Sequence, residues 1–542
     1  MRWTSIVVST ISASELKVEV HHCASGNGEL AFLDIREHGQ YGHGHPFFAI
    51  SCPYSRLESE VLRLVPRQNT PIVIYDDDDG LAGWAVNALI RIGYDDIRIL
   101  KGGAQAWAEA GFTLYQGVNV PSKAFGELVE LSCHTPAVTA LELKEMQICG
   151  ENLILLDGRT SEEYTNFSIP GGVSCPNAEL PLRFDALVDD LETTVVINCA
   201  GRTRSIIGAQ TLIDFGVSQK IFALENGTQG WALANLELEK GADRFAPKNL
   251  STAVLKATGL RAQDLAQRQK ISFVEPDTLT GWLGDKERTT YLIDVRSKAE
   301  FEVGHMSGAC HVPGGQLVQA TDLTIGVLGA RIVVCDDNEV RAIMAAHWLK
   351  RMGRNVFVLK GGVGSDSLVS GPHYYDLDPS VAMKIPSISV DGAYSGLSAK
   401  DFVAIDLRTS QAYRDGHVPG ATWCLRPQLT KFLEKTKGRS ILLLADDEHA
   451  ARLMATDITK SSDFAVFLLA GGMKAWEDAG YPLETSPNTP PDDQRKDYLF
   501  FTGQRHLGDK EHMRQYLEWE VGLVGQLDAE ERNVFKLPPD EI

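Results

Sequence analysis

The stretch TVVINCAGRTRSIIGAQTLIDFG (194–216) contains the pattern that decides the fold. Its first part, TVVIN (194–198), is a continuous apolar run of strand length, and its last part, IIGAQTLIDFG (206–216), has apolar residues at helical spacing. The turn between them, CAGRTRS (199–205), places one cysteine and two arginines where a buried strand passes into a helix. A continuous apolar strand followed by a helix is typical of a parallel sheet covered on both faces.

A unit with this pattern occurs four times in the 542 residues. Each copy opens on an apolar strand ending in Asp-x-Arg, passes through a Gly/Pro-rich loop, and continues with a second strand and a helix. Each closes on a third strand and a glycine turn. The opening strands are FLDIR (32–36), LLDGR (155–159), LIDVR (292–296) and AIDLR (404–408). We therefore expect the α/β class, as four tandem domains that each hold a small parallel sheet flanked by helices.

The gaps between the copies predict the domain boundaries. We expect repeat 1 over 1–125, repeat 2 over 126–245, repeat 3 over 271–375 and repeat 4 over 386–485, followed by a linker and helical tail over 486–542. Within the tail, HMRQYLEWEVGLVGQL (512–527) has helical spacing and predicts a docked amphipathic helix. The segment 245–270 looks helical and is expected to separate two halves, one formed by repeats 1 and 2 and the other by repeats 3 and 4.

Composition narrows the class of partner and compartment. The formal net charge is −20, with 72 acidic and 52 basic residues, which disfavours a nucleic-acid or anionic-membrane partner. No apolar stretch approaches the roughly 18–20 residues that span a bilayer. The nine cysteines are an odd number without CxxC spacing, so we expect free thiols in a reducing compartment, the cytoplasm, and no metal site.

The turn 199–205 is the candidate active site. Ligands of α/β folds bind at the carboxyl ends of the strands, and the N–H groups of such a turn favour an anion. We expect Cys199 to react as a thiolate, with Ala200, Gly201, Arg202, Thr203, Arg204 and Ser205 binding an anionic substrate, the arginines adding charge and Ser205 capping the helix. The alternative is an inert cysteine at a strand end with solvated arginines.

Only repeat 2 has a cysteine at this position. Counting back 17 residues from the glycine that ends each helix gives Asp76, Cys199 and Asp336, and the Asp-Asp pair of repeat 4 gives Asp446. Repeats 1, 3 and 4 are therefore expected to be inactive. Cys335 comes one residue earlier in repeat 3, where strand alternation predicts that it faces the opposite side of the sheet.

These combined features resemble the rhodanese family of sulfurtransferases. The shared elements are Asp-x-Arg after the first strand, the Gly/Pro loop, the strand ending in Cys before a six-residue turn, and a closing (G/N)G-x-x-x-W. The resemblance implies that Cys199 takes sulfur from thiosulfate as a persulfide and passes it to cyanide, a thiol or a protein cysteine, without a metal or organic cofactor. It also implies that Asp157 and Arg159 are largely structural, although Arg159 facing the pocket is an alternative.

Three other functions are weighed. 3-Mercaptopyruvate is the main competing donor, but the family's enzymes for it usually carry Cys-Gly-Ser/Thr-Gly, and two arginines suit a dianion better. A phosphatase of the same fold type needs Cys-x5-Arg, whereas here Arg204 comes five positions after Cys199. A largely non-catalytic scaffold for sulfur relay is the third alternative, because three repeats lack the cysteine. The oligomeric state stays open.

Overall fold

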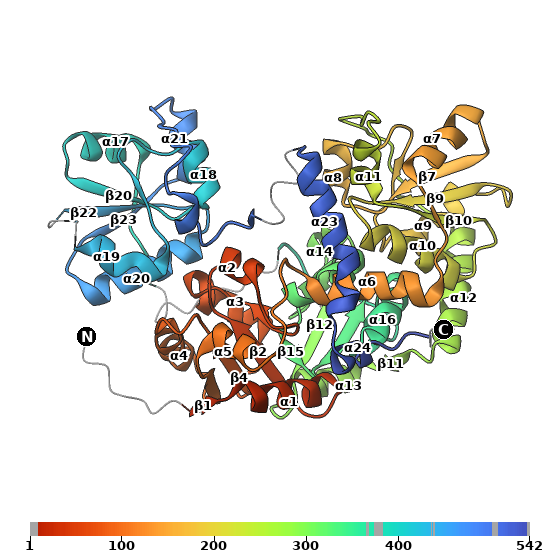
Figure 1. The fold of residues 1–542 in the computed structure, drawn as a ribbon, viewed down its shortest axis with the longest axis horizontal. Coiled ribbons are helices and arrows are strands. Elements are labelled where there is room, and N and C mark those ends of the chain that lie inside the picture. Colours follow the sequence, from red (N-terminus) through yellow and green to blue (C-terminus); the bar gives the residue numbers. More distant parts are fainter. Residues whose placement is uncertain are drawn as a thin grey trace. The chain divides into compact units, whose positions relative to one another are not determined.

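The structure is a computed structural model that describes residues 9–364, 368–372, 383–434, 436, 439–500 and 508–538. The expected boundary after residue 375 lies outside these residues. The chain divides into two compact units (Figure 1). Unit 1 comprises 1–16, 31–118 and 374–503, and unit 2 comprises 17–30, 119–373 and 504–542.

Each repeat contains a parallel sheet with the same strand order. A short strand that precedes the Asp-x-Arg strand in sequence lies at one edge, followed in space by the closing strand, the central strand, the Asp-x-Arg strand and a short edge strand. In repeat 1 the order is β1 (Ser9–Ile11), β5 (Ile97–Leu100), β4 (Ile72–Tyr75), β2 (Leu30–Asp34), β3 (Ile50–Ser51). In repeat 2 it is β6 (Ala137–Val138), β10 (Ile221–Leu224), β9 (Thr194–Asn198), β7 (Leu153–Asp157), β8 (Val173–Ser174).

Repeats 3 and 4 follow the same order. Repeat 3 has β11 (Ser272–Val274), β17 (Asn355–Leu359), β16 (Arg331–Cys335), β12 (Thr290–Asp294), β14 (Cys310–His311). Repeat 4 has β19 (Ser387–Ile388), β23 (Val466–Leu469), β22 (Ser440–Leu444), β20 (Phe402–Asp406), β21 (Thr422–Trp423). The predicted α/β class with four small parallel sheets is confirmed.

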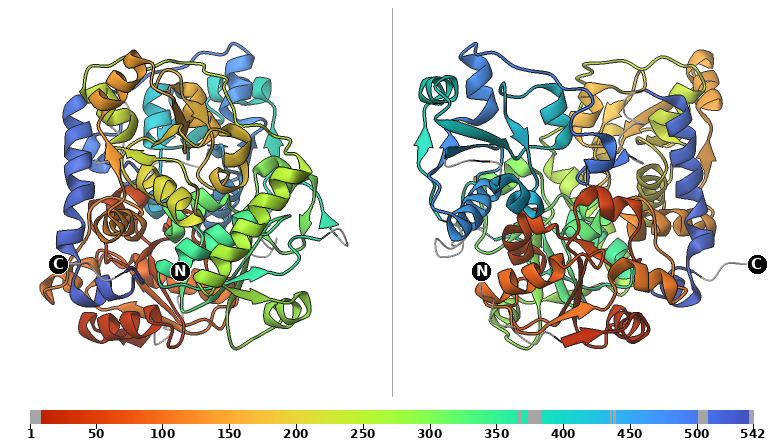
Figure 2. Two further views of the ribbon diagram at one scale, coloured as in Figure 1. Left: turned by 90° about the vertical axis from the view of Figure 1, so that its right-hand side faces the viewer. Right: turned by 60° about the vertical axis from the view of Figure 1, so that its left-hand side comes forward.

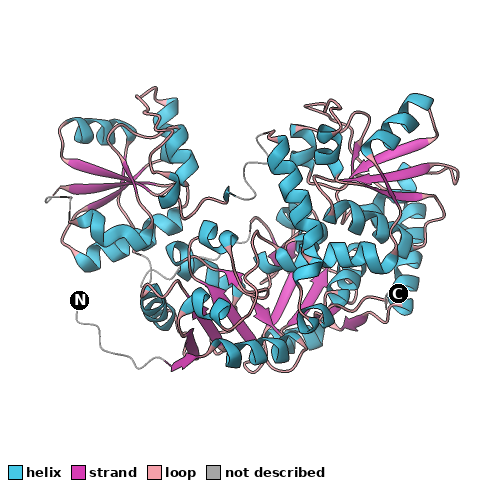
Figure 3. Cartoon of the chain, viewed as in Figure 1, coloured by secondary structure: helices cyan, strands magenta, loops and turns pink. Residues whose placement is uncertain are grey.

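Helices lie on both faces of the sheets (Figure 3). Repeat 1 contributes α1 (Ala13–Ala24), α2 (His38–His43), α3 (Leu57–Leu64), α4 (Leu81–Arg91) and α5 (Gly103–Glu109). Repeat 2 contributes α7 (Ala140–Cys149), α8 (Ser161–Asn166), α9 (Leu180–Leu187), α10 (Thr203–Phe215) and α11 (Gly227–Leu233). Repeat 3 contributes α13 (Pro276–Leu283), α14 (Lys298–Val303), α15 (Gly314–Gln319) and α16 (Val340–Arg351). Repeat 4 contributes α17 (Val390–Ser398), α18 (Ser410–Asp415), α19 (Leu429–Leu433), α20 (Glu448–Ser461) and α21 (Gly472–Asp478).

The central strand of repeat 2 shows why these strands are apolar throughout. Val195 and Ile197 pack into one buried cluster with Leu212, whereas Val196 packs into another with Trp231 on the opposite face. Successive side chains of a strand point to opposite faces, so a sheet covered twice needs an apolar residue at every position.

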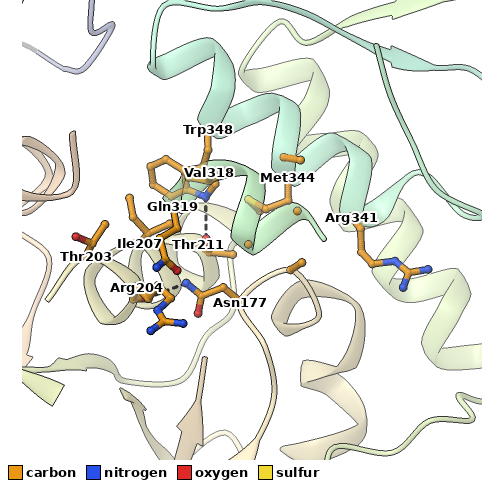
Figure 4. Close-up of a pocket in the computed structure, with 14 residues that line it drawn as sticks. Asn177, Thr203, Arg204, Ile207, Thr211, Val318, Gln319, Arg341, Met344 and Trp348 are labelled. Carbon is orange, nitrogen blue, oxygen red and sulfur yellow. Dashed lines mark hydrogen bonds between the residues drawn. The ribbon is translucent and has the colours of Figure 1, made fainter. Parts of the chain in front are cut away.

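Within unit 2, repeat 2 packs on repeat 3, so the expected pairing of repeat 1 with 2 and of 3 with 4 is wrong. Trp348 on α16 is buried and donates from its indole N–H to Thr211 on α10 at 2.8 Å (Figure 4). Arg341 on α16 pairs with Glu179 beside α9 at 2.9 Å. The spacing of apolar residues along one helix does not encode which element will cover its apolar face, so this pairing could not be predicted from the sequence.

The segment expected to separate two halves instead joins two repeats. Its helix, α12 (Thr252–Arg268), contacts α9 and α10 of repeat 2 as well as α16 of repeat 3 (Figure 2). Unit 1 contains repeat 4 and, apart from residues 17–30, repeat 1, and the two are linked by the buried ion pair of Arg426 with Glu58 at 2.6 Å.

Two further helices of unit 2 lie beside repeat 2. The expected domain limit at residue 125 falls inside α6 (Val120–Cys133), which packs along α10. The predicted tail helix is present as α23 (Lys510–Gly522) and is followed by α24 (Ala529–Asn533). Helix α23 contacts both α6 and α11. Among the described residues, no helix has the length and apolar character needed to cross a membrane.

Candidate active site

The turn that carries Cys199 is held in place by the N-terminus of α11. Cys199 follows β9 directly and is 2% exposed. The backbone N–H groups of Thr228 and Gln229 donate to the carbonyl oxygens of Cys199 and Ala200 at 2.8 and 3.1 Å. Gly227 has φ +51°, and a Cβ there would lie 2.2 Å from the carbonyl oxygen of Cys199. Gly227, the glycine of the closing (G/N)G-x-x-x-W pattern, is therefore required because the two backbones approach closely.

The side chain of Ser205 contacts the Cys199 thiol and does not cap α10. Its hydroxyl donates to Cys199 Sγ at 3.1 Å, and the Ser205 side chain is fully buried. Helix α10 begins at Thr203, two residues earlier, and its N-cap is Arg202 without a side-chain cap bond. The expectation that Ser205 caps this helix is therefore wrong, because the helix starts inside the turn.

The strand register fixes which residue of each repeat occupies the position of Cys199. The backbone N–H of Gly158 donates to Asn198 O at 2.8 Å, and the same bond joins Leu407 to Leu444 at 2.8 Å in repeat 4. The next residue in repeat 4 is Ala445, so the assignment to Asp446 from the Asp-Asp pair is wrong by one position. Asp76 and Asp336 hold the position in repeats 1 and 3, as predicted.

Ser205 and Cys199 occur together in repeat 2 alone. With this register, the residue six positions after the start of the turn is alanine in the other repeats, namely Ala82, Ala342 and Ala451. The hydroxyl that contacts the thiol is thus absent where the thiol is absent. Of the four described turns, the turn of repeat 2 is thus the one in which a hydroxyl contacts a thiol.

In repeats 1 and 3 the aspartate folds back on its own turn. Asp76 accepts hydrogen bonds from the N–H groups of Asp78 at 3.0 Å and Ala82 at 2.8 Å. Asp336 accepts one from the N–H of Arg341 at 3.0 Å, and burial raises its pKa to about 6. These turns bind a carboxylate through their N–H groups, which is the anion preference expected of such a turn.

Cys335 lies on the buried face of β16 and not in the turn of repeat 3. Its Sγ is 3.6 Å from the carbonyl oxygen of Ile293 and packs into an apolar cluster with Leu292 and Val333. Burial raises the pKa of this thiol well above its ordinary value. The predicted orientation away from the turn agrees with these contacts.

Arg202 points out of the turn toward α6. Its guanidinium binds Glu127 through Nε at 2.9 and 3.1 Å and through Nη2 at 2.9 Å, and it also contacts Glu130. Burial raises the pKa of Glu127 to about 7 despite this partner. The charge of Arg202 is therefore already opposed by carboxylates of the same chain.

Arg204 is likewise paired, and the pair is repeated elsewhere. Its Nη1 and Nη2 donate to Glu163 at 2.7 and 2.8 Å. Although burial opposes ionisation, Arg204 lowers the pKa of Glu163 to about 2. In repeat 3, Arg341 occupies the position of Arg204 and donates to Glu300 at 2.9 and 3.1 Å. The pair thus forms in a turn that has no nucleophile.

The Asp-x-Arg motif forms one ion pair in all four repeats. Arg159 is 1% exposed, donates from Nε and Nη2 to Asp157 at 2.9 and 2.7 Å, and reaches Phe167 O at 2.7 Å. The equivalent pairs are Arg36 with Asp34, Arg296 with Asp294 and Arg408 with Asp406. Their occurrence in every repeat suits a tie between strand end and loop rather than a substrate contact.

The sequence interpretation missed two residues beside the turn. Glu520 on α23 accepts hydrogen bonds from the hydroxyl of Thr203 and from its backbone N–H, the latter at 3.4 Å. Lys123 on α6 lies 3.2 Å from Glu520 and 3.3 Å from the Thr203 hydroxyl. Both are far from the turn in sequence, and no spacing rule connects them to it.

Comparison with known proteins gives the family. The model of the Rhodanese-like domain matches residues 17–110, 139–234, 275–365 and 389–479. The crystal structure of a thiosulfate sulfurtransferase from Pseudomonas aeruginosa is 39% identical, with 98% of this chain and 99% of that chain covered and a TM-score of 0.89.

Two curated relatives from Mycobacterium tuberculosis match over one part of the chain. A helix-turn-helix type transcriptional regulator is 32% identical over 106 residues, and the putative thiosulfate sulfurtransferase SseB is 28% identical over 137 residues. The alignments cover 20% and 23% of this chain and 46% of each relative, so the chain spans about half the length of these proteins. The chain belongs to the rhodanese family and carries four rhodanese-like domains in tandem.

Proposed function

We propose that this protein is a thiosulfate sulfurtransferase in which Cys199 of repeat 2 carries the sulfur. The observation that carries the proposal is the hydrogen bond from Ser205 to Cys199 Sγ at 3.1 Å, in the one repeat that has either residue at its position. A hydroxyl that donates to sulfur stabilises the thiolate, which is the nucleophilic form. The name of the Pseudomonas aeruginosa protein supports thiosulfate as the donor.

The reaction has two steps. The Cys199 thiolate attacks the outer sulfur of thiosulfate, the S–S bond breaks, and sulfite leaves with its electron pair. A thiolate, a protein cysteine or cyanide then attacks the outer sulfur of the persulfide, so that Cys199 returns to the thiolate and the acceptor keeps the sulfur. The backbone N–H groups of residues 200–205 are proposed to bind the anion, and no metal or organic cofactor takes part in either step.

The two arginines support thiosulfate as the sulfur donor less strongly than the sequence suggested. Arg202 and Arg204 are both engaged by glutamates, so their charges do not by themselves favour a dianion over 3-mercaptopyruvate. Thiosulfate is preferred because of the relatives' names and because the turn lacks the Cys-Gly-Ser/Thr-Gly pattern. Comparing kcat/KM for the two donors tests this choice, and a higher value for 3-mercaptopyruvate would overturn it.

The mass of the intact protein tests the persulfide. Brief exposure to thiosulfate should add about 32 Da to the wild type and nothing to Cys199→Ser. Cyanide should then remove the added mass. Cys149→Ser is the matched control, since Cys149 is an exposed thiol outside the site and its loss should leave the gain unchanged. No gain on the wild type would favour the scaffold alternative.

A further inference from the structure

Helix α23 covers the turn of repeat 2 with its buried face. Met513, Tyr516, Leu517 and Glu520 are the buried residues of this helix, and they are spaced three to four residues apart on one side. A Cβ built on Gly201 would lie 3.6 Å from a ring carbon of Tyr516 and 3.3 Å from Glu520 Oε2. The tail of the chain is therefore in contact with the middle of the active-site turn.

Glu520 places its carboxyl group at the N-terminus of α10. The side chain is fully buried, and its carboxylate accepts from the N–H and the hydroxyl of Thr203, the first residue of that helix. The first-turn N–H groups of a helix lack intrahelical acceptors and attract negative charge. Glu520 thus takes one of the donors that an anionic substrate would use.

The other repeats show that such a turn binds a carboxylate. In repeats 1 and 3 the carboxylate belongs to the turn itself, through Asp76 and Asp336. In repeat 2 the equivalent residue is Cys199, and a carboxylate reaches the turn from α23 instead. In repeat 4, Asp447 of the turn accepts a hydrogen bond from the N–H of His449 at 2.9 Å. All four described turns therefore bind a carboxylate, but only at the turn of repeat 2 does it come from another element.

The charges around the catalytic turn do not add up to a positive site. The described side chains that pair there comprise three cations and four carboxylates, namely Lys123, Arg202, Arg204, Glu127, Glu130, Glu163 and Glu520. Of the carboxylates, Glu520 is the one bound to the backbone of the turn. A buried carboxylate that is hydrogen-bonded to the turn acts on a bound anion through a low dielectric, and salt screens this interaction weakly.

We propose that Glu520 is a specificity-determining residue that disfavours anionic reactants at Cys199, and that α23 is the element that imposes this selection. Thiosulfate competes with the Glu520 carboxylate for the N–H groups of the turn and is repelled by it. A neutral sulfur compound does not meet this repulsion. The expected effect of Glu520 on sulfur transfer rests on the proposed function of Cys199. Its expected effect on the reaction of Cys199 with charged reagents does not.

Alkylation of Cys199 distinguishes an effect of reagent charge from an effect of access to the thiol. Iodoacetate and iodoacetamide are similar in size and differ in charge, and mass spectrometry of the peptide containing Cys199 reports the rate for that thiol alone. In Glu520→Gln the ratio of the iodoacetate rate to the iodoacetamide rate should rise about tenfold. Glutamine keeps the shape and an acceptor for Thr203, so the helix should stay docked. The kcat/KM for thiosulfate should rise in the same variant.

Two further variants give the controls. Glu518→Gln removes an equal charge from an exposed position of the same helix and should leave the ratio unchanged. Lys123→Gln removes the cation beside Glu520 and should lower the ratio. Equal acceleration of both reagents in Glu520→Gln would mean that α23 acts by steric cover alone, and no gain in the iodoacetate rate would likewise overturn the proposal. A changed ratio without any persulfide would instead contradict the proposed function only.

Discussion

Arg204 and Arg341 occupy the same position in neighbouring repeats, and each binds a glutamate of the helix that follows the Asp-x-Arg strand. The partners are Glu163 on α8 and Glu300 on α14, both at the third residue of their helix. Repeat 3 has kept this pair although its turn begins with Asp336. The pair therefore supports the shape of the turn, whether or not the turn carries a nucleophile.

Arg341→Met should destabilise the protein without removing its activity. The change leaves Glu179, Glu300 and Asp336 without their shared cation, and breaking one side of a buried ion pair costs about 3–5 kcal/mol. We expect a lower midpoint of thermal unfolding and an unchanged persulfide yield per folded molecule. Arg514→Met, which breaks an exposed pair with Glu511, is the control and should change the midpoint little. Loss of sulfur loading in folded Arg341→Met would contradict a purely structural role.

Ser205→Ala should slow sulfur loading. The variant removes the hydroxyl that donates to Cys199 Sγ, and a hydrogen bond to a charged group contributes about 1.5–3 kcal/mol. We expect the rate of persulfide formation from thiosulfate to fall about tenfold or more, because the thiolate loses this stabilisation. Rapid quenching followed by intact-mass measurement gives the rate. An unchanged rate would mean that the hydroxyl only fills space beside the sulfur.

Gly227→Ala should disrupt the turn. A Cβ at residue 227 would stand 2.2 Å from the carbonyl oxygen of Cys199 and 2.9 Å from that of Gly201, so the two backbone segments would have to move apart. We expect loss of sulfur loading by about a hundredfold, together with a lower unfolding temperature. Gly216→Ala is the matched control, since Gly216 also has a positive φ, +80°, but open space around it. It should lower stability by only about 1 kcal/mol and keep the activity.

Glu127 predicts a pH dependence of stability. Burial raises the pKa of Glu127 from 4.5 to about 7 in the folded protein. Between these pH values the folded protein therefore binds more protons than the unfolded chain. The contribution of Glu127 to stability should therefore fall as pH rises from about 4.5 to 7 and stay constant above, by up to about 3 kcal/mol. Thermal unfolding of wild type and Glu127→Gln across this range isolates the effect. A difference that does not depend on pH would contradict the raised pKa.

The sequence determined the fold of each repeat and the position of Cys199 at the start of the turn of repeat 2. Strand and helix periodicities are local, so the runs around TVVINCAGRTRS predict β9, the turn and α10 without knowledge of any other element. The same reasoning placed Cys335 on the opposite face of its strand. It failed by one residue in repeat 4, because matching the Asp-Asp pair ignored the strand pairing that puts Ala445 at the start of the turn.

The tertiary structure decided which elements surround that turn and with what charge. In the sequence Arg202 and Arg204 have no evident partner, but the structure pairs them with carboxylates on α6 and α8. Glu520, which binds Thr203, lies 317 positions after it in the sequence. The pairing of repeat 2 with repeat 3 belongs to the same class of facts. Electrostatics and packing depend on proximity in space, which the periodicity of a single element does not encode.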